Sequence, residues 1–261
     1  LKAIQTTLAK DKENNDMSLY DWYAKALSDN KQILQRITNV LVADSAFSKK
    51  PFIDNMLGIG FNVVSRLRHD AALYYLWEGD PTGKPGRPRV KGEKIDFKNI
   101  DKSKVAILDT DESNGQVYAL KAWCKSLHRK ISLVIHILPK GGHRLYFSTD
   151  ESMSGRDVME YYCTRFQIEF CFRDAKQFVG LTDSQARDTR KLDFAFNSSF
   201  TAVNVAKIMC SEYNLSIGRI KALIINAYYA QRIIDVFENN PNTQLNHEIV
   251  NEIFGFAADA A

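Results

Sequence analysis

Side chains that bind phosphate or metal ions recur at helical spacing in residues 161–176, YYCTRFQIEFCFRDAK. The apolar pattern around them predicts one long helix over residues 155–178. At about 100° per residue, four side chains fall on one stripe of this helix: Tyr162, Arg165, Glu169 and Lys176. A carboxylate among a phenol, a guanidinium and an ammonium suits a metal ligand surrounded by phosphate contacts. The pattern equally fits a surface helix on which Arg165 and Glu169 form an ordinary ion pair.

A second candidate is Asp44, the acid that ends the apolar run 39–44. That run predicts a short buried strand, residues 50–57 predict a helix, and residues 61–67 predict a second strand. Strand, helix, strand in this order predicts a right-handed parallel crossover and therefore an α/β sheet. An Asp at the carboxyl end of such a strand points into the crevice where open sheets bind ligands, and grouped carboxylates there bind Mg²⁺ or Mn²⁺. The alternative is that Asp44 only forms or caps a turn.

The middle of the chain is basic and β-rich. Residues 84–104 carry eight basic residues against three acidic ones, and residues 121–144 carry six basic residues and no acid. The Gly/Pro-rich stretch 79–92 predicts a loop. Short apolar runs separated by turn residues then predict antiparallel hairpins over residues 105–108, 116–123, 131–138 and 144–148. A concentrated positive field is what a polyanionic partner requires, although an unevenly charged, solvated surface is the alternative.

Individual residues of this basic region are candidates for DNA contacts. Gly86 to Arg89 reads GRPR and resembles the core of minor-groove hooks, which would insert Arg87 and Arg89 into a narrow groove. A solvated basic loop explains the same text. Trp123 could stack on an extruded base, or it could belong to the core. The end of the second strand and the residues just after it carry three further candidates: Arg66, Arg68 and His69. They either line the same crevice as Asp44 or are ordinary surface charges.

Helical patterns flank the β-rich region. Residues 18–35 predict an N-terminal helix capped by Ser18, and residues 193–212 and 217–238 predict two helices near the other end. With 45% hydrophobic and 25% charged residues, the 261-residue chain has an ordinary globular composition, which excludes disordered, collagenous and coiled-coil classes.

Location and redox state also follow from composition. We expect no membrane span, because the longest apolar run, residues 131–138, is far below about 20 residues. The first residues lack a signal-peptide pattern, and the four cysteines form no C-x-x-C pair. A cytoplasmic protein without a zinc site is therefore expected.

The stripe described above resembles a family signature. Tyr162, Arg165, Glu169 and Lys176 reproduce the Y-(2)-R-(3)-E-(6)-K signature of insertion-sequence DDE transposases. Residues 42–48, VADSAFS, are similar to the setting of that family's second catalytic aspartate. Three further stretches resemble the family's text after the glutamate: residues 172–177, 180–181 and 185–187.

The resemblance implies an RNase H-like α/β core interrupted by an all-β insertion, with a helical C-terminal part. We expect a first part of the core over residues 1–78, the basic β insertion over 79–152, the second part with the signature helix over 153–211, and a helical segment over 212–261. It also implies double-stranded DNA as the partner, at transposon ends and target, and a homodimer that pairs two ends.

The resemblance assigns roles to individual residues. Asp44 would be the second catalytic acid and Glu169 the third, and both would bind Mg²⁺ or Mn²⁺ for two-metal phosphoryl transfer. Tyr162, Arg165 and Lys176 would contact DNA phosphates. The family's first catalytic aspartate lies on an earlier buried strand. None of the four Asp residues before Asp44 lies in an apolar strand pattern: Asp11, Asp16, Asp21 and Asp29.

We therefore expect the first strands and their aspartate to be missing from this chain, so that it cleaves DNA poorly by itself. Two other classes of protein remain open. One is a catalytically dead DNA-binding remnant or domesticated regulator with the same fold. The other is a metal-dependent nuclease, which the Tyr, Arg and Lys of the signature disfavour.

Overall fold

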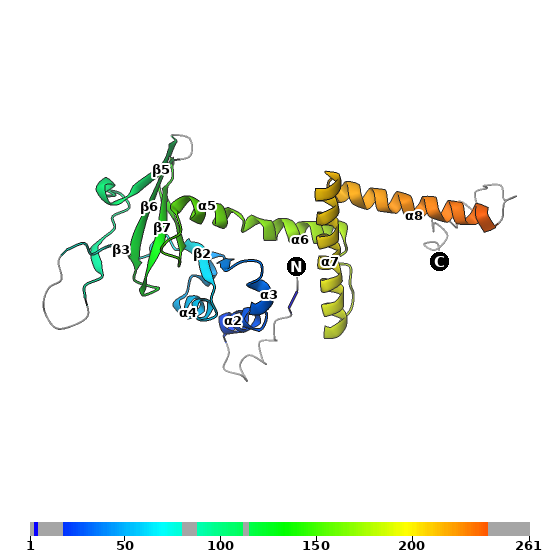
Figure 1. Cartoon of the computed structure of the whole chain (residues 1–261), viewed down its shortest axis with the longest axis horizontal. Helices are drawn as coiled ribbons and strands as arrows, with labels where there is room; N and C mark the ends of the chain where they lie inside the picture. Colours follow the sequence, from blue (N-terminus) through cyan, green and yellow to red (C-terminus); the bar gives the residue numbers. More distant parts are fainter. Residues whose placement is uncertain (1–2, 5–17, 80–87, 112–114, 240–261) are drawn as a thin grey trace. The chain divides into compact units, whose positions relative to one another are not determined.

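The computed structural model describes residues 3–4, 18–79, 88–111 and 115–239 (Figure 1). The chain folds into two compact units. The first, Thr6–Ile168, contains a mixed sheet with its covering helices, and we call it the sheet unit. The second consists of Leu1–Gln5 and Glu169–Ala261 and is helical in its described part, so we call it the helical unit.

The strand–helix–strand prediction around Asp44 is confirmed. Strand β1 (Val40–Val42) pairs in parallel with β2 (Asn62–Leu67), and α4 (Lys50–Gly58) connects them. The register places Val42 opposite Val64. Pro51 starts α4, where the missing amide hydrogen of proline costs no helical hydrogen bond.

The four predicted β runs are also confirmed, with extended bounds. They form strands β5 (Ala106–Asp111), β6 (Gly115–Cys124), β7 (Arg129–Ile137) and β8 (His143–Ser148), and neighbouring strands pair antiparallel. Two further strands were not predicted: β3 (Leu73–Leu76) and β4 (Lys91–Lys94).

The eight described strands form one sheet in the order β1-β2-β8-β7-β6-β3-β4, with β5 paired to β6. The basic β segment is therefore continuous with the parallel pair, because β8 pairs antiparallel with β2. The four-segment division made from the sequence stays a prediction.

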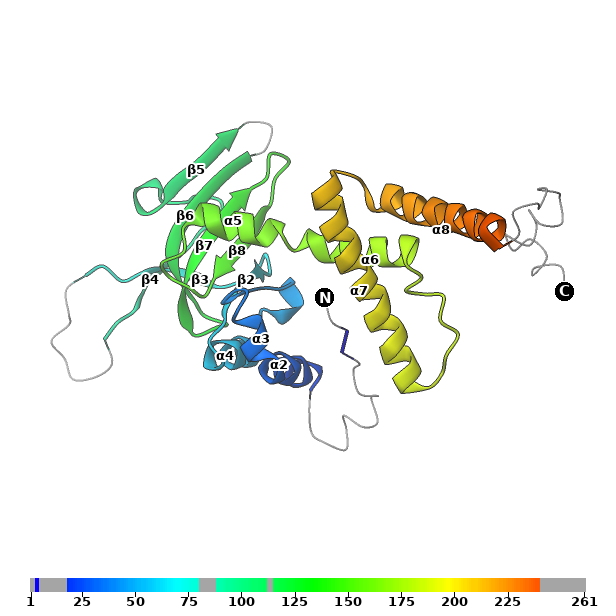
Figure 2. The ribbon, with the colours of Figure 1, turned by 45° about the vertical axis from the view of Figure 1, so that its right-hand side comes forward.

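Side-chain alternation gives the sheet two apolar faces. One face carries Val63, Leu133 and Phe147 and is covered by α2 and α4, which contribute Ala24 and Phe52 to the same core cluster. The opposite face is covered by α5 (Gly155–Cys163), which lies across β6 and β7 in Figure 2.

Helix α5 starts close to the sheet because its first residue is a glycine. A Cβ atom on Gly155 would lie 2.5 Å from the Ala119 Cβ and 2.8 Å from the Leu108 Cδ1. A larger residue would therefore force α5 away from the sheet. The core on this face is formed by Val64, Val134, Tyr146, Val158 and Tyr162.

The N-terminal helix is shorter than predicted. Ser18 caps α2 (Leu19–Asp29) in a capping box with Asp21, as its position suggested. The helix ends at Asn30, whose side-chain Nδ2 donates a 2.8 Å hydrogen bond to the Ala26 carbonyl, and α3 (Lys31–Leu34) follows as a separate turn. This local bond competes with the helical pattern and explains the break.

The predicted single helix over residues 155–178 is wrong, because it is two helices. Helix α5 ends at Cys163 and α6 (Phe166–Phe178) begins after Thr164 and Arg165. The Thr164 hydroxyl donates a 2.7 Å hydrogen bond to the Tyr161 carbonyl, and the backbone N–H groups of Arg165 and Gln167 bond to carbonyls three residues earlier. These tighter turns replace the regular helical bonds at the junction.

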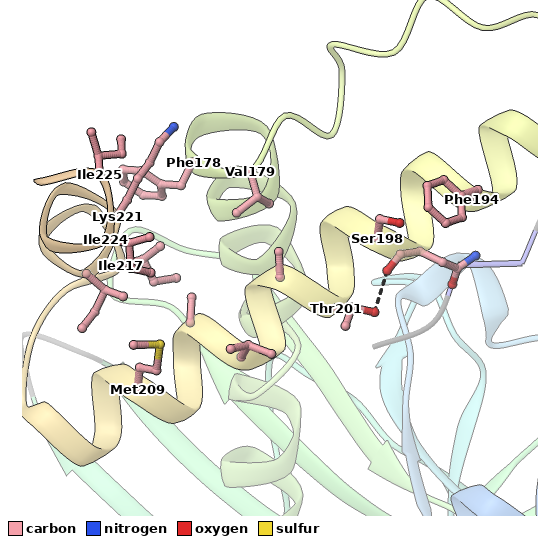
Figure 3. Close-up of a pocket in the computed structure, with 15 residues that line it drawn as sticks. Phe178, Val179, Phe194, Ser198, Thr201, Met209, Ile217, Lys221, Ile224 and Ile225 are labelled. Carbon is pink, nitrogen blue, oxygen red and sulfur yellow. Dashed lines mark hydrogen bonds between the residues drawn. The ribbon is translucent and has the colours of Figure 1, made fainter. Parts of the chain in front are cut away.

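The helical unit contains α6 from Glu169 onward, α7 (Thr189–Tyr213) and α8 (Ile217–Asn239), which confirm the predicted C-terminal helices. Asn214 ends α7 in the left-handed conformation that Asn tolerates, with φ at 52°. A cavity of about 690 Å³ lies between α7, α8 and the end of α6, and its walls are mostly apolar (Figure 3). Within the described residues, no helix is long and apolar enough to span a membrane.

Candidate active site

Asp44 lies just beyond the carboxyl end of β1. The Ala43 N–H still donates a 3.0 Å bond to the Val64 carbonyl, so the strand pairing continues up to the residue before Asp44. The exposed Asp44 side chain accepts a 2.6 Å hydrogen bond from the Ser45 N–H and starts a short 3₁₀ turn, Ser45–Phe47. Asp44 is therefore at the strand end, as predicted, and it also caps the turn that follows.

A buried serine on the neighbouring strand fixes the backbone of this turn. Ser65 is fully buried, and its hydroxyl lies 3.1 Å from the Asp44 carbonyl oxygen and 2.9 Å from the Ser48 hydroxyl. The Ser48 hydroxyl lies 2.9 Å from the Arg66 carbonyl oxygen. These bonds connect both ends of the turn to β2. The sequence analysis did not identify Ser65, whose only signal was a polar residue inside an apolar strand.

Tyr162 is the signature residue that the structure places near Asp44. It lies in the last turn of α5, is 8% exposed, and packs its ring against that of Tyr146 on β8, with centroids 4.9 Å apart. Burial raises the pKa of its phenol above the ordinary 10.0. The positive charges of Arg66 and Arg165 lower this pKa, and the negative charge of Asp44 raises it further. The phenol is thus neutral at physiological pH and lies within electrostatic range of all three charged groups.

Strand register places Arg66 at the level of Asp44. Val42 is paired with Val64, so Asp44 and Arg66 each follow two residues later on neighbouring parallel strands. Arg66 is opposite Tyr146 on β8, and residues directly opposite each other share a face of the sheet. The half-buried Arg66 therefore lies on the α5 face, beside the tyrosine pair.

Arg165 lies at the junction between α5 and α6. Its guanidinium carbon is 4.7 Å from the centroid of the Phe166 ring and 6.0 Å from that of Tyr162. The side chain is half-buried. Arg165 is therefore held over aromatic surfaces at the junction instead of on the regular helical stripe that the sequence suggested.

Glu169 and Lys176 belong to the helical unit. They lie in the first and last turns of α6, both exposed, and their spacing of seven residues puts them on one side of the helix. The side of α6 that packs in the unit's core carries Cys171 and Ala175, which is roughly opposite. Because Asp44 lies in the sheet unit and Glu169 in the helical unit, the predicted proximity of the two carboxylates stays a prediction.

The structure describes two of the three candidates in the basic β region, Arg89 and Trp123. Arg87 lies outside the described residues. Arg89 is exposed, and its guanidinium carbon lies 3.8 Å from the centroid of the Trp77 ring. Trp123 is half-buried on β6 and is opposite Tyr74 on β3. Trp77, which precedes the Gly/Pro-rich stretch, was overlooked although an aromatic beside a basic loop is a recognisable signal.

The available donors suit a hard divalent cation. The carboxylate oxygens of Asp44 and Glu169 are ligands that Mg²⁺ and Mn²⁺ prefer. Across residues 3–4, 18–79, 88–111 and 115–239, no group of three or more His, Cys, Asp and Glu side chains is arranged around a common centre.

Comparison with known proteins identifies the family of the chain. Residues 24–205 match the model of the family described as the transposase DDE domain. The match covers most of the chain, including β1, β2, α5 and α6, and the chain belongs to this family. The fold is accordingly an RNase H-like α/β core with a helical C-terminal part. A comparison with curated proteins finds no match.

Proposed function

We propose that this chain is the catalytic part of a DNA transposase that cleaves the ends of an insertion sequence and transfers them by two-metal chemistry. One observation carries the proposal: in a member of the transposase DDE family, Asp44 ends a parallel strand beside Arg66 and Tyr162. In such an arrangement the acid can bind a metal ion, while the cation and the neutral phenol bind a phosphate beside it.

The residues divide into two roles. Asp44 and Glu169 would hold divalent ions, Mg²⁺ or Mn²⁺, and the chemistry that such ions would supply is activation of the attacking hydroxyl and stabilisation of the leaving oxygen. Tyr162, protonated because burial raises its pKa, donates a hydrogen bond to a phosphate oxygen. Arg165 and Lys176 neutralise phosphate charge and fix the register of the DNA without reading its sequence.

Double-stranded DNA, at the element ends and the target, is the partner in this proposal. The basic β region supports it: Arg89 and Trp77 present a cation over an exposed aromatic at the sheet edge, while Trp123 is a second candidate for stacking. Arg87 is an expected minor-groove contact. The proposal places the protein in the cytoplasm, in association with the nucleoid.

A homodimer that pairs two ends is supported by the helical unit. Helix α8 exposes large apolar side chains on several sides: Leu223, Ile224, Ile225, Tyr228 and Ile234. Exposed apolar side chains of this size are normally covered by a partner, and a second copy offers the same surface in return. Light scattering of the chain should give twice 29.7 kDa. Ile224→Glu should give the monomer, and Asn226→Glu on the same helix should leave the dimer intact.

The chain by itself should cleave DNA poorly. Of the Asp residues that precede Asp44, Asp21 and Asp29 belong to helix α2, and Asp11 and Asp16 lie outside the described residues. Two carboxylates are too few to hold two ions firmly. The same observation favours the second candidate, a DNA-binding remnant without catalytic activity. A metal-dependent nuclease is a third candidate, which would cleave without joining ends.

A cleavage and joining assay in the full-length protein tests the proposal. Asp44→Asn and Glu169→Gln keep the side-chain shapes and should each abolish Mg²⁺-dependent cleavage of element ends. Asp109→Asn and Glu160→Gln change equally exposed acids on β5 and α5 and should leave cleavage unchanged. DNA binding without cleavage in the unaltered protein would establish the remnant instead, and cleavage without joining would establish the nuclease.

A further inference from the structure

A second concave site adjoins Asp44 within the sheet unit. It is a cavity of about 360 Å³ at the carboxyl end of β2 and the beginning of β8. Its walls include Ser45, the residue after Asp44, together with five basic or imidazole side chains: Arg66, Arg68, His69, His143 and Arg144. Apart from Arg66, which lies beside Asp44, none of these five side chains has a role in the site described above.

Strand register brings the arginines to one face of the sheet. Leu67 is opposite Leu145, so Arg66 on β2 and Arg144 on β8, each one residue away from this pair, lie on the alternate face. That face is the one covered by α5, because Arg66 is opposite Tyr146. Arg66 is the second-last residue of β2 and Arg68 directly follows the strand, and both line the cavity.

The back of the cavity is held in place by His143. Its Nε2 lies 2.8 Å from the His69 carbonyl oxygen, which ties the start of β8 to the segment after β2. The Phe97 ring stacks on the imidazole with centroids 4.2 Å apart and an interplanar angle of 27°. These contacts fix the wall from which Arg144, the next residue, extends.

The charge balance of the cavity is positive. Arg68 forms an ion pair with Asp70, with an Nε–Oδ1 distance of 3.1 Å, but both side chains are more than half exposed. Such exposed pairs are weak because water and salt screen them, so a phosphate can replace the carboxylate. Arg144 is exposed, and the stretch from 121 to 144 that it ends contains no acid.

We propose that Arg68 and Arg144 bind one backbone phosphate of the DNA strand that passes Asp44. The inference rests on the proposed function and adds a contact to it. Guanidinium groups pair with phosphate oxygens through two parallel N–H bonds, and two of them converge on this cavity. Ser45 and Arg66 line the cavity and also lie beside Asp44, so the cavity adjoins the Asp44 site. A DNA strand that passes Asp44 could therefore place its next phosphate in the cavity.

Salt-dependent binding of the 261-residue chain to a 30-base-pair duplex of arbitrary sequence tests this. Each phosphate that a protein neutralises adds about 0.9 to the slope of log affinity against log salt. The double variant Arg68→Ala/Arg144→Ala should therefore lower the slope by about 0.9, the amount for one phosphate. Arg144→Lys should retain most of the slope, since it keeps the charge.

Lys25→Ala is the matched control. Lys25 is exposed on α2, which covers the opposite face of the sheet, so the same loss of charge should leave the slope unchanged. An unchanged slope in the double variant overturns the phosphate contact. An equal decrease of the slope in Lys25→Ala also overturns it, because it would indicate only a general charge effect.

These failures are distinct from failure of the proposed function. Mg²⁺-dependent end cleavage by the full-length protein measures that function, whatever the slope of the arginine variants. If the unaltered chain does not bind the duplex at low salt, the phosphate contact is overturned, while end cleavage still decides the function.

Discussion

Tyr146 and Tyr162 pack their rings together at a centroid distance of 4.9 Å and an angle of 57° between the ring planes. The contact joins β8 of the sheet to the last turn of α5, so the position of one signature residue is fixed by the sheet core. Because Arg66 is opposite Tyr146, the same contact sets the phenol beside a cation at the level of Asp44. Tyr162 therefore belongs to the core and also lies within electrostatic range of Arg66 and Asp44.

Tyr162 variants should separate these two contributions. Tyr162→Ala removes a ring that is 8% exposed and should destabilise the sheet unit by about 3 kcal/mol. Tyr162→Phe keeps the ring packing and should cost less than about 1.5 kcal/mol. Urea denaturation at pH 7 measures both values.

The Phe variant then isolates the hydroxyl. It should fold normally and cleave element ends more slowly in the full-length protein, because the hydrogen bond to phosphate is lost. Met159→Leu, a change on the same helix, controls for disturbance of α5. Full cleavage by Tyr162→Phe would show that the phenol has only a packing role.

Ser65 should act through Asp44 without touching DNA. Ser65→Ala deletes a buried hydroxyl, so the Asp44 carbonyl oxygen and the Ser48 hydroxyl each lose a hydrogen-bond partner. The free energy of unfolding should fall by about 1–2 kcal/mol. As a positioning residue, it should lower the cleavage rate more than DNA affinity. Its Mg²⁺ dependence is the decisive readout: a misplaced Asp44 should require a higher Mg²⁺ concentration, whereas a purely structural loss would leave that requirement unchanged. Ser65→Thr should restore much of the rate if its methyl group fits.

The ion pair between Asp54 on α4 and Arg129 on β7 should make stability depend on pH. The hydrogen bond from Lys50 chiefly lowers the pKa of Asp54 below 3.8, and Arg129 adds to the effect. A carboxyl with a lowered folded pKa stabilises the fold above its unfolded pKa, and this contribution disappears as the pH falls through the folded value.

Asp54→Asn should therefore cost less than about 1 kcal/mol at pH 7, a small value because the carboxylate is 37% exposed. The difference in urea midpoint between the two proteins should shrink steadily as the pH is lowered below 3.8. At neutral pH, added salt should also reduce this difference in urea midpoint, because salt screens the ion pair. A difference that stays constant from pH 7 to pH 3 would mean that the cost comes from packing alone.

Sequence reasoning was most accurate where the pattern is local. The crossover from β1 through α4 to β2 followed from short apolar runs, and the cap at Ser18 from its position at the start of a helical pattern. The junction at Thr164 was missed because a hydroxyl that donates to the carbonyl three residues earlier leaves the apolar periodicity unchanged.

The long-range features of the sheet could not be predicted in this way. The Lys-rich β4 has no apolar alternation and is a strand because it pairs with β3. Likewise, the pairing of β2 with β8 brings Arg66 to Tyr146 across 80 positions of sequence, and no spacing rule contains that register. Ser65 became identifiable only once the Asp44 carbonyl was known to lie against it.

The two exposed charges of α6 should respond in opposite ways to neutralisation in the full-length protein. Lys176→Ala removes a phosphate contact, so it should weaken DNA binding and lower the salt slope by about 0.9. Glu169→Gln removes a negative charge that repels phosphates until a cation is bound, so without Mg²⁺ its affinity should equal or exceed that of the unaltered protein. Added Mg²⁺ should strengthen binding by the unaltered protein more than by Glu169→Gln, since only the former has the full ligand. Weaker metal-free binding by Glu169→Gln would contradict the role of Glu169 as a metal ligand. An unchanged slope for Lys176→Ala would contradict the phosphate contact of Lys176. Both conclusions would hold whatever the family.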